Sequence, residues 1–193
     1  FTFNEWDAFE RSDEQGNKIK NSSFLGRDLI ANGHEMALHG YNHVSLLEEE
    51  WKESDYMVTA LQTAMKKWNL AGFGPPPVSY VPPSNYIDSI GMANLKKAIP
   101  SIKYIQSVYL GDLDEGGDRE FDVDPYANYF FDYPRISSGF NLTPSDIYSI
   151  ESLYLYTGVW SHFIHPDDVF ETPDKYQSTS AKYDFDLRNE EGL

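Results

Sequence analysis

The chain has 193 residues, 40% of them hydrophobic and 16% aromatic, which is the composition of one globular domain rather than of a disordered chain. Its formal net charge of -16 argues against nucleic acid or an anionic membrane as a partner, because both are bound through lysine and arginine. The absence of cysteine excludes disulfides, a thiolate nucleophile and cysteine-based metal sites. No stretch approaches the ~20 apolar residues of a membrane span, so we expect no membrane insertion. Because the chain starts at Phe1 without a methionine or a signal peptide, we expect it to be part of a larger polypeptide.

Apolar periodicity divides the chain into alternating strands and helices. In chain order, we predict a strand at Phe1–Phe3, a helix at Ser23–Gly33, a strand at Glu35–His39, a helix at Glu53–Leu70, a strand at Val78–Val81, a helix at Ile87–Ile99, strands at Ile102–Leu110 and Tyr129–Tyr133, a helix at Pro144–Tyr154 and a strand at Val159–His165. The helix at Glu53–Leu70 is the clearest, because its apolar residues recur at helical spacing.

The order of these elements predicts the fold class. Strands that alternate with helices are typical of parallel sheets with crossover helices, so we expect an α/β protein. We interpret residues 1–170 as one domain. Residues 171–193 show no periodic signal and are interpreted as a polar C-terminal segment of that domain.

The five histidines fall into two clusters, at residues 33–43 and 161–168, each at the end of a predicted strand. Loops at the carboxyl ends of parallel strands carry the chemistry of α/β barrels. His39 and His43 lie four residues apart, so on a helical turn their imidazoles would converge on one cation, and two neutral imidazoles favour zinc or another late first-row metal. The alternative is two unrelated surface histidines. We favour metal binding because Gly40 also permits a sharp turn between them.

Three segments resemble motifs of the polysaccharide deacetylases, the NodB-like domains of carbohydrate esterase family 4. Gly33–His43 resembles the second motif, in which two histidines bind the metal ion. Tyr80–Tyr86 resembles the third motif, which is rich in proline. Gly158–His165 resembles the fifth, a hydrophobic strand that ends in the general-acid histidine, here His165.

The resemblance implies a distorted (β/α) barrel that removes acetyl groups from a glycan with the help of a divalent metal, usually zinc. His39 and His43 would bind the metal ion. Tyr41, Tyr80 and Trp160 lie near the motifs in the sequence and are candidates for stacking on sugar rings of the carbohydrate substrate. The resemblance also suggests a bacterial protein of the cell envelope or a secreted one.

The sequence departs from the family in its first motif, Thr-Phe-Asp-Asp-Gly, which supplies the catalytic base and the third metal ligand. No such motif is present, so we expect both aspartates upstream of residue 1 and a barrel that is incomplete at its N-terminus. Gly40 stands where Ser or Thr is usual in the second motif. Val81 replaces the arginine that partners the base; Arg135 either substitutes for it or is an ordinary arginine in a Pro-Gly turn.

In the second cluster, strand alternation directs His162 and His165 to opposite faces. We assign the general acid to His165 because it stands at the end of the predicted strand. Asp167 or Asp168 either orients its imidazole or is a capping or solvated carboxylate.

Two other functions compete with the deacetylase. A non-catalytic glycan-binding or scaffold domain that keeps the fold is favoured by Val81 and by the missing first motif. A glycoside hydrolase would need a pair of carboxylates, and no pair stands out in the sequence. The acidic run Asp112–Asp118 lacks the spacing of an EF-hand and is interpreted as a solvated loop rather than a calcium site.

Overall fold

The computed structural model describes residue 3 and residues 10–12, 18–107, 121–135, 137–138 and 143–164. The chain divides into two compact units, Phe1–Pro134 and Arg135–Leu193, which are described separately. The elements of the first unit are β1 (Glu10–Ser12), β2 (Lys18–Lys20), α1 (Asn21–Ala31), η1 (Glu48–Glu50), α2 (Ser54–Ala71), β3 (Ser79–Tyr80), η2 (Pro83–Asn85), α3 (Ser89–Ala98), β4 (Tyr104–Ile105) and β5 (Phe131–Asp132). The elements of the second unit are β6 (Ser137–Ser138), α4 (Pro144–Thr157) and β7 (His162–Phe163).

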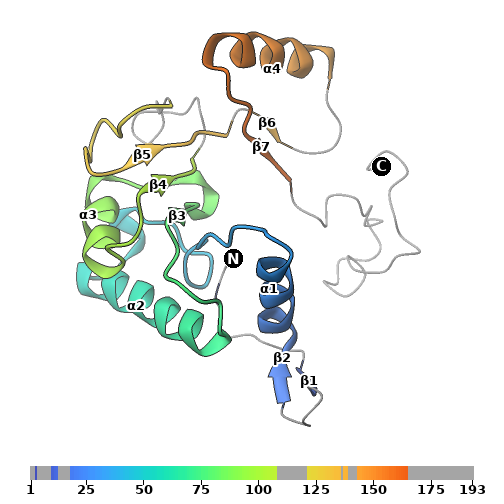
Figure 1. Ribbon diagram of the computed structural model, residues 1–193. Helices are drawn as coiled ribbons and strands as arrows, with labels where there is room; N and C mark the ends of the chain where they lie inside the picture. Colours follow the sequence, from blue (N-terminus) through green and yellow to red (C-terminus); the bar gives the residue numbers. More distant parts are fainter. Residues whose placement is uncertain are drawn as a thin grey trace, which may run out of the picture. The chain divides into compact units, whose positions relative to one another are not determined.

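A parallel three-stranded sheet in the order β3-β4-β5 forms the centre of the first unit (Figure 1). Tyr80 is the register partner of Ile105 on β4, and Ile105 is the partner of Asp132 on β5. Since α3 lies in the chain between the parallel strands β3 and β4, the predicted α/β class with crossover helices is confirmed.

Two further pairings in the first unit are single parallel bridges, one of them to β3. Leu38 forms a bridge with Tyr80, and Phe3 forms one with Tyr41. The strand predicted at Glu35–His39 is therefore reduced to an isolated bridge, whereas of the strand predicted at Phe1–Phe3 only Phe3 lies among the described residues.

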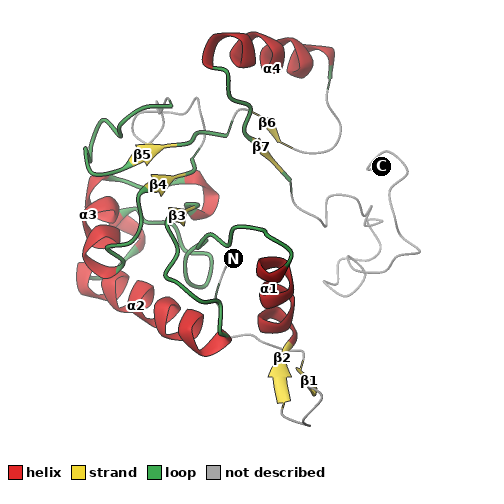
Figure 2. Cartoon of the chain, in the orientation of Figure 1, coloured by secondary structure: helices red, strands yellow, loops and turns green. Residues whose placement is uncertain are grey.

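A barrel is not formed by the described residues, which corrects the expectation of a distorted (β/α) barrel to an open α/β sheet. Closure requires the two edge strands of a sheet to pair in a staggered register. Here β6 and β7 pair only with each other, as a separate two-stranded sheet of the second unit. The strands β3, β4 and β5 also extend for only two residues each, and loops occupy much of the chain between the helices (Figure 2).

Helix α2 confirms the clearest sequence prediction and supplies much of the core. It begins one residue later than predicted and ends one residue later, at Ala71, after which Gly72 adopts a left-handed φ of 72°. Its buried face consists of Met57, Val58, Leu61, Ala64, Trp68 and Ala71. This face belongs to the same hydrophobic cluster as Leu38, Tyr80 and Ile105 of the strand segments, and α3 packs alongside α2 (Figure 1).

In the second unit, β6 and β7 are parallel, with Ser137 opposite His162, and α4 lies between them in the chain. A capping box begins α4: the Thr143 hydroxyl accepts a hydrogen bond from the Asp146 amide, and the Asp146 carboxylate accepts one from the Thr143 amide. None of the α4 side chains is buried. Across the described residues, no helix is both long and apolar enough to span a membrane.

Candidate metal centre

His39 and His43 stand at the two ends of a left-handed turn that follows the Leu38 bridge. The backbone φ angles of Gly40, Asn42 and His43 are 70°, 53° and 56°, so the segment is not the helical turn expected from the spacing. The turn nevertheless brings the two imidazole centres to 4.9 Å, with their planes at 81°. The two side chains thus lie close together as predicted, but a left-handed turn rather than a helical turn brings them there.

A hydrogen bond of 2.7 Å between Nδ1 of His39 and the Val81 carbonyl oxygen orients the His39 ring. Because a carbonyl only accepts, Nδ1 carries a proton in this hydrogen bond, and a neutral ring would then have its lone pair on Nε2. Histidines that bind metal ions commonly donate their other N–H to a carbonyl in this way. Val81 therefore orients the His39 ring through its backbone carbonyl. It stands at the position where the third motif usually has an arginine side chain.

The distance between the two ring centres is close to that of two imidazoles on one tetrahedral ion. With each nitrogen about 2.0–2.1 Å from a tetrahedral zinc, two bound imidazoles have their ring centres about 5 Å apart. His39 is half-buried and His43 is exposed, so the pair is accessible from solvent on one side. Among the described residues, no group of three or more His, Asp or Glu side chains is arranged to hold a metal ion.

The loop after β3 packs against the histidine turn. A Cβ atom added to Gly40 would lie 2.8 Å from Cγ of Pro83 and 3.3 Å from the Tyr80 hydroxyl oxygen. In this second loop, Ser84 and Asn85 have φ angles of 54° and 72°. Non-glycine residues in left-handed conformations are uncommon and concentrate at functional sites, and here both loops at this edge carry a pair of them.

The aromatic residues predicted near the site differ in accessibility. The Tyr41 ring is half-buried and has the Lys67 Nζ atom 5.3 Å from its centre. Tyr80 is fully buried, and its hydroxyl has no hydrogen-bond partner among the described residues. Burial raises the pKa of Tyr80 above its usual value, so the phenol stays neutral.

The other predicted residues belong to the second unit. Trp160 is 51% exposed and donates from Nε1 to the Ser137 hydroxyl oxygen at 3.0 Å. The Arg135 guanidinium lies 4.4 Å from the centre of the Phe163 ring, and burial lowers the pKa of Arg135. His165, Asp167 and Asp168 lie outside the described residues, so the general acid stays a prediction.

The sequence did not reveal the contacts of His162. Its Nδ1 lies 2.7 Å from the Ser137 hydroxyl oxygen, across the parallel pair of β6 and β7. Ser137 has no motif around it, and only the register between the two strands identifies it as the neighbour of His162.

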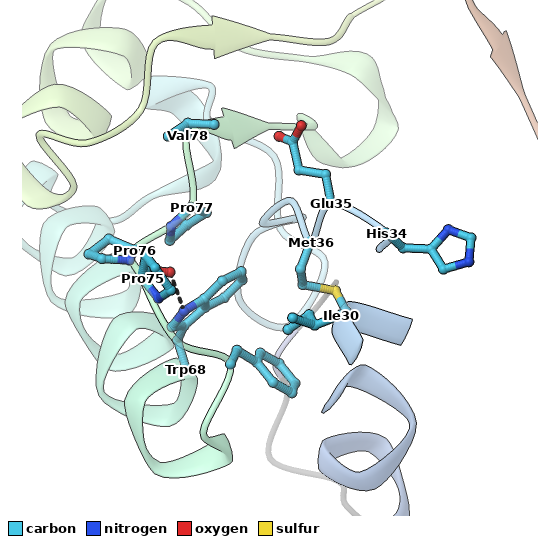
Figure 3. A pocket seen from close by; sticks show the side chains of 10 residues that line it. Ile30, His34, Glu35, Met36, Trp68, Pro75, Pro76, Pro77 and Val78 are labelled. Atoms are coloured by element: carbon cyan, nitrogen blue, oxygen red, sulfur yellow. Dashed lines mark hydrogen bonds between the residues drawn. The ribbon is translucent and has the colours of Figure 1, made fainter. Parts of the chain in front are cut away.

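A pocket of about 180 Å³ lies at the other end of the strand segments (Figure 3). It is lined by Ile30, His34, Glu35, Met36, Trp68, Phe73, Pro75, Pro76, Pro77 and Val78. Trp68 Nε1 donates to the Pro75 carbonyl oxygen at 3.0 Å, and the Ser79 hydroxyl donates to Glu35 Oε1 at 2.6 Å. Its lining residues precede β3 and the Leu38 bridge in the chain, whereas the histidine turn follows that bridge, so the pocket is separate from the candidate metal centre.

Comparison with known proteins identifies a family and includes a distant structural likeness. The family described as "Uncharacterised protein conserved in bacteria (DUF2194)" matches residues 4–184. No curated protein matches the chain. A crystal structure described as that of a "putative polysaccharide deacetylase" from Mycobacterium smegmatis is similar with a TM-score of 0.47 and 16% sequence identity, over 74% of this chain and 52% of that one. The chain therefore spans about half the length of that protein.

Proposed function

This chain belongs to the DUF2194 family of bacterial proteins, and we propose that it is a metal-dependent hydrolase that removes acetyl groups from a glycan. In this proposal His39 and His43 bind the metal ion, which we take to be zinc. One observation carries the proposal: His39 Nδ1 donates a hydrogen bond to the Val81 carbonyl oxygen, which leaves Nε2 of this ring as the nitrogen that would bind the ion. The centre of the His39 ring lies 4.9 Å from the centre of the His43 ring.

The substrate class rests on the motifs quoted from the sequence. A bound zinc ion would polarise the acetyl carbonyl and lower the pKa of a water molecule. His165 would give a proton to the leaving nitrogen or oxygen of the sugar. Tyr41 and Trp160 would contact the glycan, whereas Tyr80 is fully buried and is left out of this role. Arg135 would stand in for the arginine that Val81 replaces.

Zinc content and turnover of acetylated chitooligosaccharides and acetylated xylan, both measured on the full-length protein, test the proposal together. His39→Ala and His43→Ala should each lose zinc and turnover, because each removes one of two imidazole ligands. His34→Ala is the matched control, since His34 is an exposed histidine of the same cluster and is not assigned to the metal. Full zinc stoichiometry in both His39→Ala and His43→Ala would show that the metal assignment is wrong.

The general acid is tested by His165→Ala. This variant should lower kcat by about 10²–10⁴-fold, the usual contribution of a general acid, while its zinc content stays equal to that of the unmodified chain. Unchanged kcat would remove His165 from the mechanism and leave the metal proposal intact.

A second candidate function is a non-catalytic glycan-binding domain that retains the metal site. Val81 favours it, because an aliphatic side chain cannot pair with a carboxylate base as the usual arginine does. Zinc bound through His39 and His43, together with measurable glycan binding and no release of acetate from any acetylated oligosaccharide, would favour this function over the hydrolase.

A further inference from the structure

A serine and a histidine meet across the two-stranded sheet of the second unit (Figure 1). Ser137 on β6 is the register partner of His162 on β7, and its hydroxyl oxygen lies 2.7 Å from Nδ1 of the imidazole. Both residues are half-buried, so each keeps part of its surface in contact with solvent. A hydroxyl nucleophile thus stands within hydrogen-bond reach of a base, and the proposed function gives neither side chain a role.

A hydrogen bond from Trp160 orients the serine hydroxyl. The indole Nε1–H can only donate, and it donates to the Ser137 hydroxyl oxygen at 3.0 Å. The hydroxyl keeps its own proton for a second hydrogen bond, and Nδ1 of His162 accepts it in the tautomer that carries its proton on Nε2. In this arrangement the imidazole can take the serine proton while the oxygen attacks a carbonyl carbon.

We propose that Ser137 and His162 form a nucleophile–base pair that hydrolyses small carboxylic esters, a second activity that needs no metal ion. Trp160 is a positioning residue in this site, because it acts through the Ser137 oxygen. Both members of the pair belong to the second unit, so the inference does not rest on the histidine pair of the first unit or on the proposed function.

Hydrolysis would proceed in two steps. In the first, Ser137 Oγ forms a bond to the acyl carbon while its proton passes to Nδ1 of His162. The bond from the acyl carbon to the alcohol oxygen then breaks, and that oxygen leaves with the same proton. In the second, water gives a proton to Nδ1 and attacks the acyl carbon, after which Oγ takes that proton back and the carboxylic acid leaves. The only co-reactant is water.

Covalent labelling of the full chain by a fluorophosphonate in the presence of EDTA tests the pair. The reagent phosphonylates activated serines, so peptide mass spectrometry should find the label on Ser137. His162→Ala should be labelled about 10²–10⁴-fold more slowly, the usual contribution of a general base, and Ser137→Ala should lose the label at this position. Ser161→Ala is the matched control: it removes a half-buried serine hydroxyl next to His162 and should be labelled like the unmodified chain.

Turnover of para-nitrophenyl acetate in EDTA distinguishes this inference from the proposed function. Release of nitrophenol should fall in both Ser137→Ala and His162→Ala, because each removes one member of the pair. It should stay unchanged in His39→Ala, which removes a residue of the candidate metal centre. Metal-dependent release of acetate from glycans together with an unlabelled Ser137 would overturn this inference alone and leave the proposed function standing.

The imidazole tautomer gives a readout that needs no variant. Nitrogen-15 NMR of the unmodified chain should show the neutral His162 ring with its proton on Nε2, since Nδ1 accepts from Ser137. A neutral ring protonated on Nδ1 would make Ser137 the acceptor and overturn the inference. The absence of label on Ser137, or equal labelling rates in His162→Ala and the unmodified chain, would overturn it as well.

Discussion

At the scale of single residues, Gly40 sets the geometry of the histidine pair. Its φ of 70° begins the left-handed turn, and the absence of a Cβ atom allows Pro83 to pack against it. The Ser or Thr that the related motif usually carries would meet Pro83 here. The His-x-x-x-His spacing therefore predicted which side chains meet, but the turn that joins them depends on a contact with a loop more than forty residues away.

Gly40→Ala should destabilise the protein and weaken zinc binding. The left-handed conformation costs an alanine about 1–2 kcal/mol, and the contact with Pro83 adds about 1–3 kcal/mol of overpacking. Gly33→Ala is a matched control, since Gly33 has a φ of 87° but open space around it, and should show only the conformational cost. Urea denaturation measures both, and equal losses in the two variants would contradict the importance of the Pro83 contact.

At the scale of elements, helix starts are fixed by side chains that the apolar pattern does not identify. Asp88 precedes α3, and its Oδ1 accepts a hydrogen bond from the Gly91 amide at 2.7 Å while its Oδ2 accepts one from the Glu48 amide at 2.7 Å. One carboxylate thus caps α3 and also binds the amide of Glu48, the first residue of η1. Apolar periodicity placed a helix at Ile87–Ile99, whereas this cap begins it at Ser89.

Asp88→Ala should therefore lower the unfolding free energy by about 1–2 kcal/mol, the upper part of the range for a lost helix cap, because two backbone amides lose their acceptor. The comparison variant is Asp55→Ala, which removes an exposed acid from the first turn of α2 that is not its N-cap. The denaturant midpoints of the two variants measure the effect. A loss of unfolding free energy for Asp88→Ala that is no larger than for Asp55→Ala would show that the cap adds little stability.

The start of α4 should depend on pH. Hydrogen bonds from the side chain and then the backbone of Thr143 lower the pKa of Asp146 below its usual value. A carboxyl group whose folded pKa is lowered contributes stability above its unfolded pKa of about 3.9 and loses it as the pH falls through the folded value. NMR secondary shifts of the first turn of α4 should thus show fraying below about pH 4. In Asp146→Asn the first turn of α4 should already be frayed at neutral pH, and acid should not change it further. If acid frays this turn in the variant as much as in the unmodified chain, another group is responsible for the effect.

At the scale of the whole molecule, metal binding should be linked to folding of the first unit. His39 and His43 meet only when the turn, β3 and the following loop are packed together, so the unfolded chain offers no comparable pair. A ligand that binds only the folded state stabilises it by about 2.7 kcal/mol at a hundredfold excess over its dissociation constant.

Zinc at that excess should therefore raise the melting temperature of the first unit by about 5–10 °C, and EDTA should reverse the shift. Magnesium is the control ion, because it prefers oxygen ligands and gains little from two imidazoles. Thermal unfolding of the unmodified chain and of His39→Ala measures the effect; a zinc shift of the same size in both proteins would place the ion elsewhere.

The amino-acid sequence by itself determined the α/β class, the bounds of α2 to within one residue and the residues of the histidine pair. These follow from local periodicity and short spacings, which need no knowledge of distant contacts. Only the tertiary structure decided that the sheet stays open, that Phe3 and Leu38 pair at single bridges, and that His39 is oriented by the Val81 carbonyl. Strand pairing depends on segments that are far apart in the chain, and the register between them leaves no periodic trace in either segment alone.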